Sequence, residues 1–197
     1  MLVKAKDKQK LPIVLVCGGS CSGKSSFAQR FRKAYVLSMD HFYYGKAGMK
    51  PDKNGKYNFD VPESVDIVSC AKAAELLAKR KQVTIPIYDM KTSERVGVQK
   101  IKATPGTRLV VVEGIFAFYC PLREAATLRI YLDTPTEIRV ARRMLRDVEK
   151  GRSNIETLAW SITVEKNHAK YVEPTKKYAD LSIPFSYNPV QLEKVTK

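Results

Sequence analysis

The sequence has few of the residues that build metal sites and disulfide frameworks. Its 197 residues include two histidines and four cysteines, and Cys17, Cys21, Cys70 and Cys120 form no C-x-x-C pair. Zinc sites and disulfide scaffolds depend on closely spaced or paired residues of these types. The composition therefore argues against a structural zinc site. It favours reduced thiols, as expected of a cytoplasmic protein.

Long apolar stretches are also missing. No run approaches the ~18 apolar residues that a membrane-spanning helix needs, and the first apolar segment, residues 11–17, is short and ends at two glycines. We therefore expect neither a membrane span nor a secretory signal. A chain of this length suits one domain, which we expect at residues 11–188 after a loose basic tail at residues 1–10.

Acidic residues are scarce relative to basic ones. The chain has 35 Lys and Arg against 20 Asp and Glu, which gives a formal net charge of +15. Such an excess favours an anionic partner, and a nucleotide or a nucleic acid would satisfy it. The basic residues are spread along the chain without a nucleic-acid-binding motif, so a solvated basic surface explains them better than a nucleic-acid site. We expect no specific nucleic-acid partner.

One motif organises the chain, a glycine-rich loop that follows an apolar strand. Residues 18–25 read GGSCSGKS, which fits the phosphate-binding pattern G-x-x-x-x-G-K-[ST] at every fixed position. Residues 13–17 are typical of a buried parallel strand, and residues 26–31 have helical spacing. The backbone N–H groups of such a loop cradle phosphates. The motif therefore predicts binding of a nucleoside triphosphate.

The residues of this loop have distinct expected roles. The glycines allow positive φ and bring the backbone close to phosphate oxygens. Lys24 would contact the β- and γ-phosphates, and the Ser25 hydroxyl is a suitable Mg²⁺ ligand. The expected nucleotide-binding residues of the loop are Gly18, Gly19, Ser20, Ser22, Gly23, Lys24, Ser25 and Ser26.

Two carboxylates follow other predicted strands. Residues 34–38 predict a short strand just before Asp40, and residues 108–114 predict a central strand that contains Glu113 near its end. Ligands of open α/β sheets bind beyond the carboxyl ends of the strands. Asp40 is thus a candidate reacting group, with the N-cap of a turn as the alternative. Glu113 is a candidate Mg²⁺ ligand, with a simple strand-end charge as the alternative.

The middle of the chain predicts a loop, a helix and a hairpin. Residues 45–62 have the composition of a lid or a binding wall. Residues 65–81 predict an amphipathic helix that buries Val65, Val68, Ala71 and Leu76, with Leu77 as a further candidate. Residues 83–89 and 96–102 predict an antiparallel hairpin, separated by a polar connection at 91–95.

Arginines gather near the end of the chain. After a predicted strand at residues 127–133, Pro135 opens a helix with a dense basic face at positions 139, 142, 143 and 146. Arg152 follows a break at Gly151, before a second helical segment at residues 155–171. These arginines could close over phosphates as a lid, or form a solvated face paired with Asp147 and Glu149. The upstream loop favours the lid, and residues 180–184 predict a last strand.

Together these segments resemble the uridine–cytidine kinase family, within the phosphoribulokinase and uridine kinase group of P-loop kinases. The resemblance runs from about Leu11 to Pro184. Its motifs, in order, are GGSCSGKSS, LSMDHFYY, YNFDVPES, IPIYDMKTSER, VVVEGIFAFY, YLDTPTEIRVARRMLRDVEKGRS and PTKKYADLSIP. It implies a three-layer α/β P-loop NTPase fold with a five-stranded parallel sheet like that of nucleoside monophosphate kinases, and with the hairpin as a flap.

The resemblance also implies an activity and a set of site residues. The activity is transfer of the ATP γ-phosphoryl group to the 5′-hydroxyl of uridine or cytidine, and the usual assembly of the family implies a homo-oligomer. By position Asp40 resembles the catalytic base, Arg146 and Arg152 resemble lid arginines, and Ser25 and Glu113 form the Mg²⁺ side. The implied nucleoside-site residues are Tyr43, Phe59, Asp60, Tyr88 and Arg143.

The chain departs from the family pattern at three places. Met90 and Ser93 stand where the family has a Phe and a His that contact the pyrimidine, Trp160 replaces a Gln, and the lid is one residue shorter before Gly151. The nearest alternative is therefore a kinase of the same group that acts on pantothenate, a sugar phosphate or another hydroxyl. A regulatory GTPase is a further alternative, but the guanine motif N-K-x-D is absent and D-x-x-G spacing occurs only at residues 52–55 in a polar loop.

Overall fold

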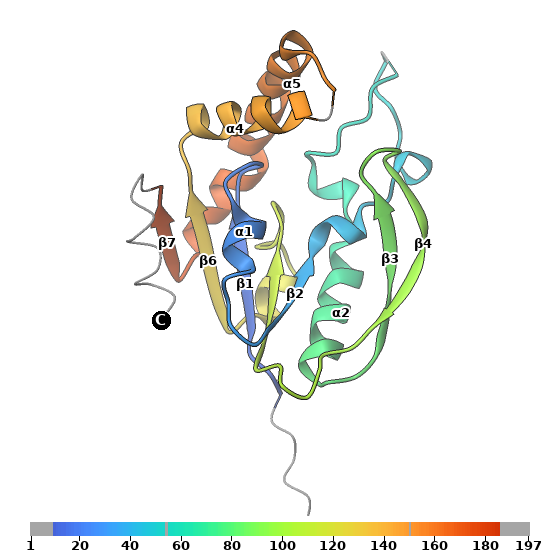
Figure 1. The fold of residues 1–197 in the computed structure, drawn as a ribbon, viewed down its shortest axis with the longest axis vertical. Coiled ribbons are helices and arrows are strands. Elements are labelled where there is room, and N and C mark those ends of the chain that lie inside the picture. The colour runs from blue at the N-terminus through green and yellow to red at the C-terminus, as the bar shows by residue number, and fades with distance from the viewer. Residues whose placement is uncertain (1–9, 54, 150, 186–197) are drawn as a thin grey trace, which may run out of the picture.

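The computed structural model describes residues 10–53, 55–149 and 151–185, so the predicted basic tail lies outside them except for Lys10, as do residues 186–188. A parallel sheet of five strands in the order β2-β5-β1-β6-β7 forms the centre of the molecule (Figure 1). The strands are β1 (Ile13–Gly18), β2 (Ala34–Ser38), β5 (Leu109–Glu113), β6 (Leu128–Asp133) and β7 (Leu181–Pro184). The predicted five-stranded parallel sheet is confirmed.

Helices cover both faces of this sheet and make three layers. Because alternate residues of a strand point to opposite faces, Ile13 and Leu15 pack with α2 (Ile67–Ala78), and Val14 and Val16 pack with α1 (Lys24–Ala28). Every residue of β1 is buried, as expected of a strand covered on both faces. The short helix α3 (Leu122–Ala125) adds Leu122 to the α2 side.

The predicted hairpin stands beside α2 as a separate two-stranded sheet (Figure 1). It consists of β3 (Val83–Asp89) and β4 (Glu94–Ile101). The second strand begins earlier than predicted, since Glu94 pairs with Asp89. Arg95 also fixes this end of the hairpin, because its guanidinium donates to the carbonyls of Phe42 (3.0 Å) and Tyr43 (2.7 Å).

Two helices, α4 (Thr136–Glu149) and α5 (Asn154–Asn167), lie above the carboxyl ends of the central strands (Figure 1). A capping box of Ser153 and Glu156 starts α5. A π-helical turn, His168–Val172, and a 3₁₀ segment, Glu173–Tyr178, lead from α5 to β7. No helix in the described part of the chain has the length and apolar character needed to cross a membrane.

Two further details differ from the sequence predictions. The helix predicted at residues 65–81 spans Ile67–Ala78, and Val68 is 64% exposed instead of buried. Asp66 caps this helix by accepting from the Ser69 N–H, and this start turns Cys70, Ala74 and Leu77 inward. The predicted basic face of α4 is also partly wrong, because Arg139 and Arg143 are buried.

Candidate active site

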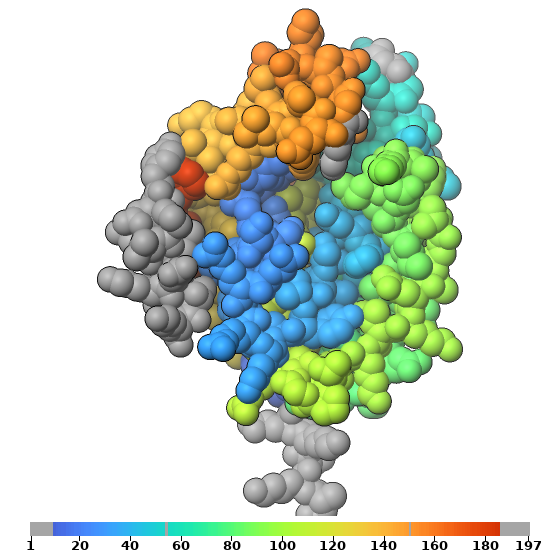
Figure 2. Space-filling view, viewed as in Figure 1, coloured from blue at the N-terminus to red at the C-terminus, as the bar shows by residue number. Residues whose placement is uncertain are grey.

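A cavity of about 660 Å³ lies where the carboxyl ends of β1, β2 and β5 face helices α4 and α5. The surface is hollowed here between the orange helices above and the blue and green segments below (Figure 2). Most of the residues predicted for the site line it, although they come from distant parts of the chain. They are Ser20, Lys24, Ser25, Asp40, Tyr43, Phe59, Asp60, Tyr88, Ser93, Glu113, Arg143, Arg146 and Arg152.

The remaining predicted residues of the glycine-rich loop lie elsewhere. Ser22, Gly23 and Ser26 line a neighbouring cavity of about 380 Å³ together with Arg142 and Phe185. Gly18 and Gly19 line neither cavity. Because they belong to the same loop, their expected contribution is through the backbone.

Several residues of the main cavity were not predicted. Tyr57 is the first residue of the YNFD motif, but the family resemblance implied no role for it, and Glu156 is recognisable from the sequence only as half of a capping box. The unpredicted lining residues are Cys21, Tyr57, Ile115, Glu156, Thr157 and Val164. Met90 and Trp160, which the sequence singled out as departures from the family pattern, also line the cavity.

The glycine-rich loop is held in shape by its own lysine and by an arginine behind it. The Lys24 ammonium is almost buried and donates to the Gly19 carbonyl at 2.8 Å. Gly23 has φ of +97°, which favours glycine. Gly19 is required for a different reason, since a Cβ there would lie 2.5 Å from Arg139 Nη1. These contacts fix the shape of the loop.

A group of oxygen atoms lies next to Lys24. The Glu113 carboxylate is 5% exposed and accepts hydrogen bonds from Ser38 Oγ at 2.7 Å and Ser25 Oγ at 3.3 Å. Ser25 and Glu113, the two residues predicted for the Mg²⁺ site, are thus in direct contact. Hydroxyl and carboxylate oxygens are the donors that Mg²⁺ prefers. These residues therefore fit a magnesium ion that takes its other ligands from phosphates and water.

Asp40 lies in the 3₁₀ turn Met39–Phe42, immediately after β2. The N-cap of this turn is Ser38, whose hydroxyl accepts from the Asp40 N–H at 3.3 Å, so the alternative in which Asp40 caps a turn is wrong. Asp40 is exposed at the cavity, yet the protein packed around it raises its pKa to about 6 by desolvation, helped by the negative charge of Glu113 and opposed by Lys24 and Arg146. A carboxyl group with this pKa can take up a proton near neutral pH.

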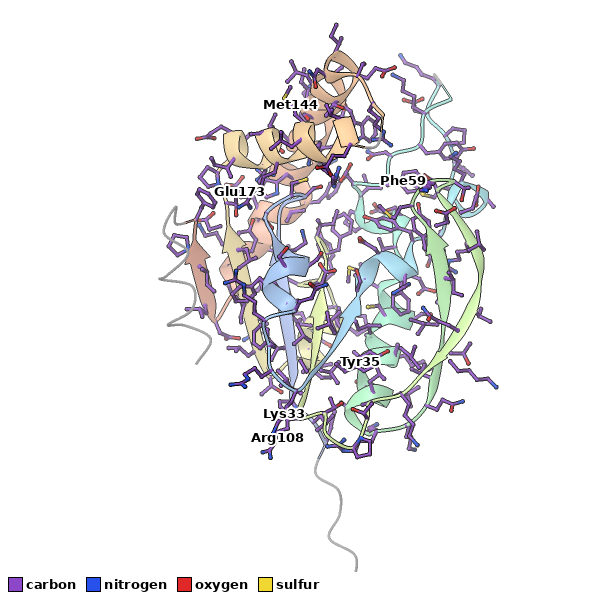
Figure 3. All side chains as sticks on the ribbon, in the orientation of Figure 1. Lys33, Tyr35, Phe59, Arg108, Met144 and Glu173 are labelled. Carbon is purple, nitrogen blue, oxygen red and sulfur yellow. The ribbon has the colours of Figure 1, made fainter. Side chains whose placement is uncertain are left out.

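Aromatic rings form the wall opposite the loop. Tyr43 packs edge-on against Phe59, with ring centroids 5.9 Å apart, and lies 5.3 Å from the ring of Tyr88. Tyr57 stacks on the far side of Phe59 at 6.4 Å. Figure 3 shows Phe59 between the hairpin and the helices above it. Such a wall suits a planar, partly apolar ligand.

An acid and an arginine with spare bonding capacity lie beside these rings. Arg143 is 1% exposed, and its Nη2 is buried without a hydrogen-bond partner among the described residues. Desolvation raises the pKa of Asp60, and the positive charge of Arg143 opposes that rise. A buried donor without a partner is costly. The arrangement therefore favours a ligand with hydroxyl groups at this place.

Glu165 connects the two sides of the cavity. Its carboxylate accepts from Arg139, which lies behind Gly19, at 2.6 Å and contacts Arg143 at 3.6 Å. Buried arginines need such compensation, because an unpaired buried charge destabilises the fold strongly. One carboxylate thus supports both the glycine-rich loop, through Arg139, and the side of the cavity where Arg143 lies.

Arg146 and Arg152 are held by a single buried acid. Asp147 Oδ1 accepts from Arg146 at 2.9 Å, and Asp147 Oδ2 accepts from Arg152 at 3.3 Å. The side chain of Asp147 is 2% exposed, while those of Arg146 and Arg152 are 44% and 58% exposed. The pairing with Asp147 predicted for a solvated face is therefore present, yet both arginines also line the cavity, as predicted for a lid.

Comparison with known proteins places the chain in a family. Residues 13–189 match the model of the Phosphoribulokinase / Uridine kinase family. The chain belongs to this family. This confirms the resemblance drawn from the sequence motifs, and a phosphotransferase is the kind of enzyme that the family name describes.

Individual relatives agree with this assignment. The chain is 34% identical to the "Uridine kinase" of Chloroflexus aurantiacus over 93% of this chain and 92% of that protein. It is 36% identical to the "Uridine-cytidine kinase A" of Dictyostelium discoideum over 91% of this chain, but it spans only 37% of that longer protein. The phosphoribulokinase of Rhodobacter spheroides has the same fold, with a TM-score of 0.65, 16% identity, and coverage of 90% of this chain and 71% of that one.

Proposed function

We propose that this chain transfers the γ-phosphoryl group of ATP to the 5′-hydroxyl of uridine or cytidine. The observation that carries the proposal is that one cavity is lined by Lys24 and Asp40, by the aromatic wall, and by Asp60 and Arg143. The names of the Chloroflexus and Dictyostelium relatives support the choice of acceptor. They make pantothenate or a sugar phosphate the less favoured acceptor.

The proposed reaction uses the two ends of the cavity for different tasks. Asp60 and the unpaired Nη2 of Arg143 would bind the ribose hydroxyls and aim the 5′-hydroxyl at the γ-phosphate. Asp40 would accept the proton of that hydroxyl, for which its raised pKa is suited. Lys24 and the two lid arginines would stabilise the charge that spreads over the transferred group. Positioning and charge stabilisation supply most of the catalysis in this reaction class.

Magnesium would be held by Ser25 and Glu113 together with the phosphates. When bound, it would neutralise phosphate charge. Among the described residues no group of three or more His, Cys, Asp or Glu side chains is arranged to hold a metal ion by itself. This agrees with an ion that keeps several water and phosphate ligands, as Mg²⁺ does in kinases.

Recognition of the base is where this chain should differ from the family pattern. Ser93 lines the cavity together with Tyr88. A site without this His donor discriminates less well between bases, because a wrong base then leaves fewer buried polar groups of the protein without a hydrogen-bond partner. We therefore expect a raised KM for uridine and cytidine and a flatter preference among nucleosides. Ser93→His should restore selectivity by roughly 1–3 kcal/mol, measured as the ratio of kcat/KM between two nucleosides.

A coupled ATP-consumption assay tests the proposal. The panel contains uridine, cytidine, adenosine, guanosine, pantothenate and ribulose 5-phosphate, and ATP is compared with GTP. We expect uridine and cytidine to be phosphorylated. Fast turnover of a non-nucleoside, with both pyrimidine nucleosides inert, would refute the nucleoside assignment and leave only the kinase family.

The same proposal covers the pathway, the cellular compartment and the assembly of the chain. The reaction would serve pyrimidine salvage in the cytoplasm, and all four cysteines of the structure are free thiols. A homo-oligomer is expected from the family resemblance, and light scattering of the purified chain would measure it. Binding of DNA or RNA with steep salt dependence would contradict our expectation that nucleic acid is not a partner.

A further inference from the structure

A second cavity, of about 840 Å³, lies at the opposite end of the sheet from the active site. The segments that lead into β1, β2, β5 and β6 all contribute to its lining. Its size lies within the usual range for small-molecule pockets. Nothing in the proposed reaction uses it, since the carboxyl ends of the strands face the other way.

The charges around this cavity all have one sign. Lys10, Lys33, Arg80 and Arg108 line it, and none of the acidic residues that the structure describes does. None of the four forms an ion pair within the described ranges. Figure 3 shows Lys33 and Arg108 next to each other at the foot of the sheet, and the Arg108 N–H donates to the Lys33 carbonyl at 2.7 Å. Clustered cations without counter-ions create a strong positive potential that attracts anions.

One wall of the cavity is held rigidly by Arg80. Its Nη1 donates to the Thr104 carbonyl at 2.9 Å, and its Nη2 donates to the Thr107 carbonyl at 2.7 Å. These bonds fix the loop that carries Arg108 against the end of α2. Of the four cations Arg80 is thus fixed by the fold, while Lys10, Lys33 and Arg108 are exposed.

We propose that this cavity binds a metabolite that bears a di- or triphosphate group, at a site separate from both substrates. Its phosphates would contact Lys10, Lys33 and Arg108, and Pro12 and Pro105 offer apolar surface to the rest of the molecule. Phosphate groups fit because several cations can share their oxygens, whereas one carboxylate would leave most of the positive charge uncompensated.

Calorimetry with inorganic tripolyphosphate tests the proposal. The probe is titrated without added Mg²⁺ into the full chain and into Lys24→Ala, in which binding at the phosphate loop is weakened. We expect a binding event that Lys24→Ala retains and that weakens with added salt. The absence of such an event would overturn the proposal.

Charge reversal distinguishes a specific site from general attraction. Lys33→Glu combined with Arg108→Glu should weaken tripolyphosphate at least tenfold. The matched control, Lys72→Glu with Lys100→Glu, makes the same change in net charge at two exposed lysines outside both cavities and should bind as the unmodified chain does. Equal weakening in both would overturn the proposal. Should the first variant fail to fold, Lys33→Ala with Arg108→Ala replaces it, and unchanged binding in that variant would be equally decisive.

Discussion

The two ends of the active-site cavity are built in different ways. The phosphate end uses one continuous loop with a local bond between Lys24 and Gly19, and Glu113 and Arg139 from distant elements lie against it. The acceptor end assembles side chains from β3, the loop before α2, α4 and α5. The first end therefore tolerates little change in backbone, while the second depends on ion pairs and packing between distant elements. Variants should reflect this difference.

The largest effect is expected where the two ends meet. Asp40→Asn should lower kcat by ~10²–10⁴-fold and leave ATP affinity nearly intact, because it removes a proton acceptor of similar shape outside the phosphate loop. Steady-state kinetics and calorimetry with ATP measure the two quantities. Glu63→Gln, at an exposed carboxylate outside the cavity, is the control. Loss of ATP binding in step with loss of rate would show that Asp40 is not the base.

A smaller but broader effect is expected within the loop. Lys24→Ala should lower kcat by ~10²–10³-fold and also weaken ATP, because the ammonium group contacts phosphates in both the ground state and the transition state. It should also loosen the loop, since the bond to the Gly19 carbonyl is lost. The exposed Lys72→Ala is the matched control. Unchanged activity of Lys24→Ala would refute the phosphate-loop assignment.

The third effect isolates the positioning of the lid arginines. Asp147→Asn removes the charge that holds Arg146 and Arg152, so kcat/KM for ATP should fall by roughly 10–100-fold, as charged hydrogen bonds are worth about 1.5–3 kcal/mol.

A double-mutant cycle separates this role from a general loss of stability. When Arg146 and Arg152 are already alanine, Asp147→Asn should cost little further activity. A full additional loss in that background, or a fall in thermal unfolding temperature that explains the rate, would mean that Asp147 only stabilises the fold.

The smallest expected effect is a dependence on pH. A general base works only when deprotonated, and the folded protein raises the pKa of Asp40 to about 6. kcat/KM for the nucleoside should therefore fall about tenfold per pH unit below 6 and reach a plateau above it. The residual rate of Asp40→Asn should lack this inflection. An inflection that persists in the variant would assign it to another group, such as His41.

The phosphate end was predictable because its geometry follows from local chain order. Strand, loop and helix occur in sequence, and the strands that end near Asp40 and Glu113 belong to the same parallel sheet. The place of Asp40 and Glu113 in the site could be predicted from one rule, that ligands bind beyond the carboxyl ends of the strands. The five-stranded parallel sheet was predictable for the same reason, together with the family resemblance.

The acceptor end was predictable only by resemblance, and parts of it were missed. Arg139 and Arg143 are buried, although arginine side chains are usually exposed. Their charges are compensated by Glu165, which lies 26 residues from Arg139 along the chain. Nothing in residue spacing indicates that contact. The predicted burial of Val68 was wrong because the capping residue, Asp66, decides where α2 begins and which of its residues face the core. Tyr57 and Glu156 enter the cavity through tertiary packing alone.

The bridge made by Glu165 limits how the enzyme can diversify. A change of acceptor would ordinarily come from repacking α5 or moving Arg143, while the phosphate loop stayed constant. Here any shift of α5 also moves the carboxylate that neutralises Arg139, the residue behind Gly19. Variation in acceptor preference is therefore easiest at positions outside this bridge, such as Met90, Ser93 and Trp160, where the chain already departs from the family pattern.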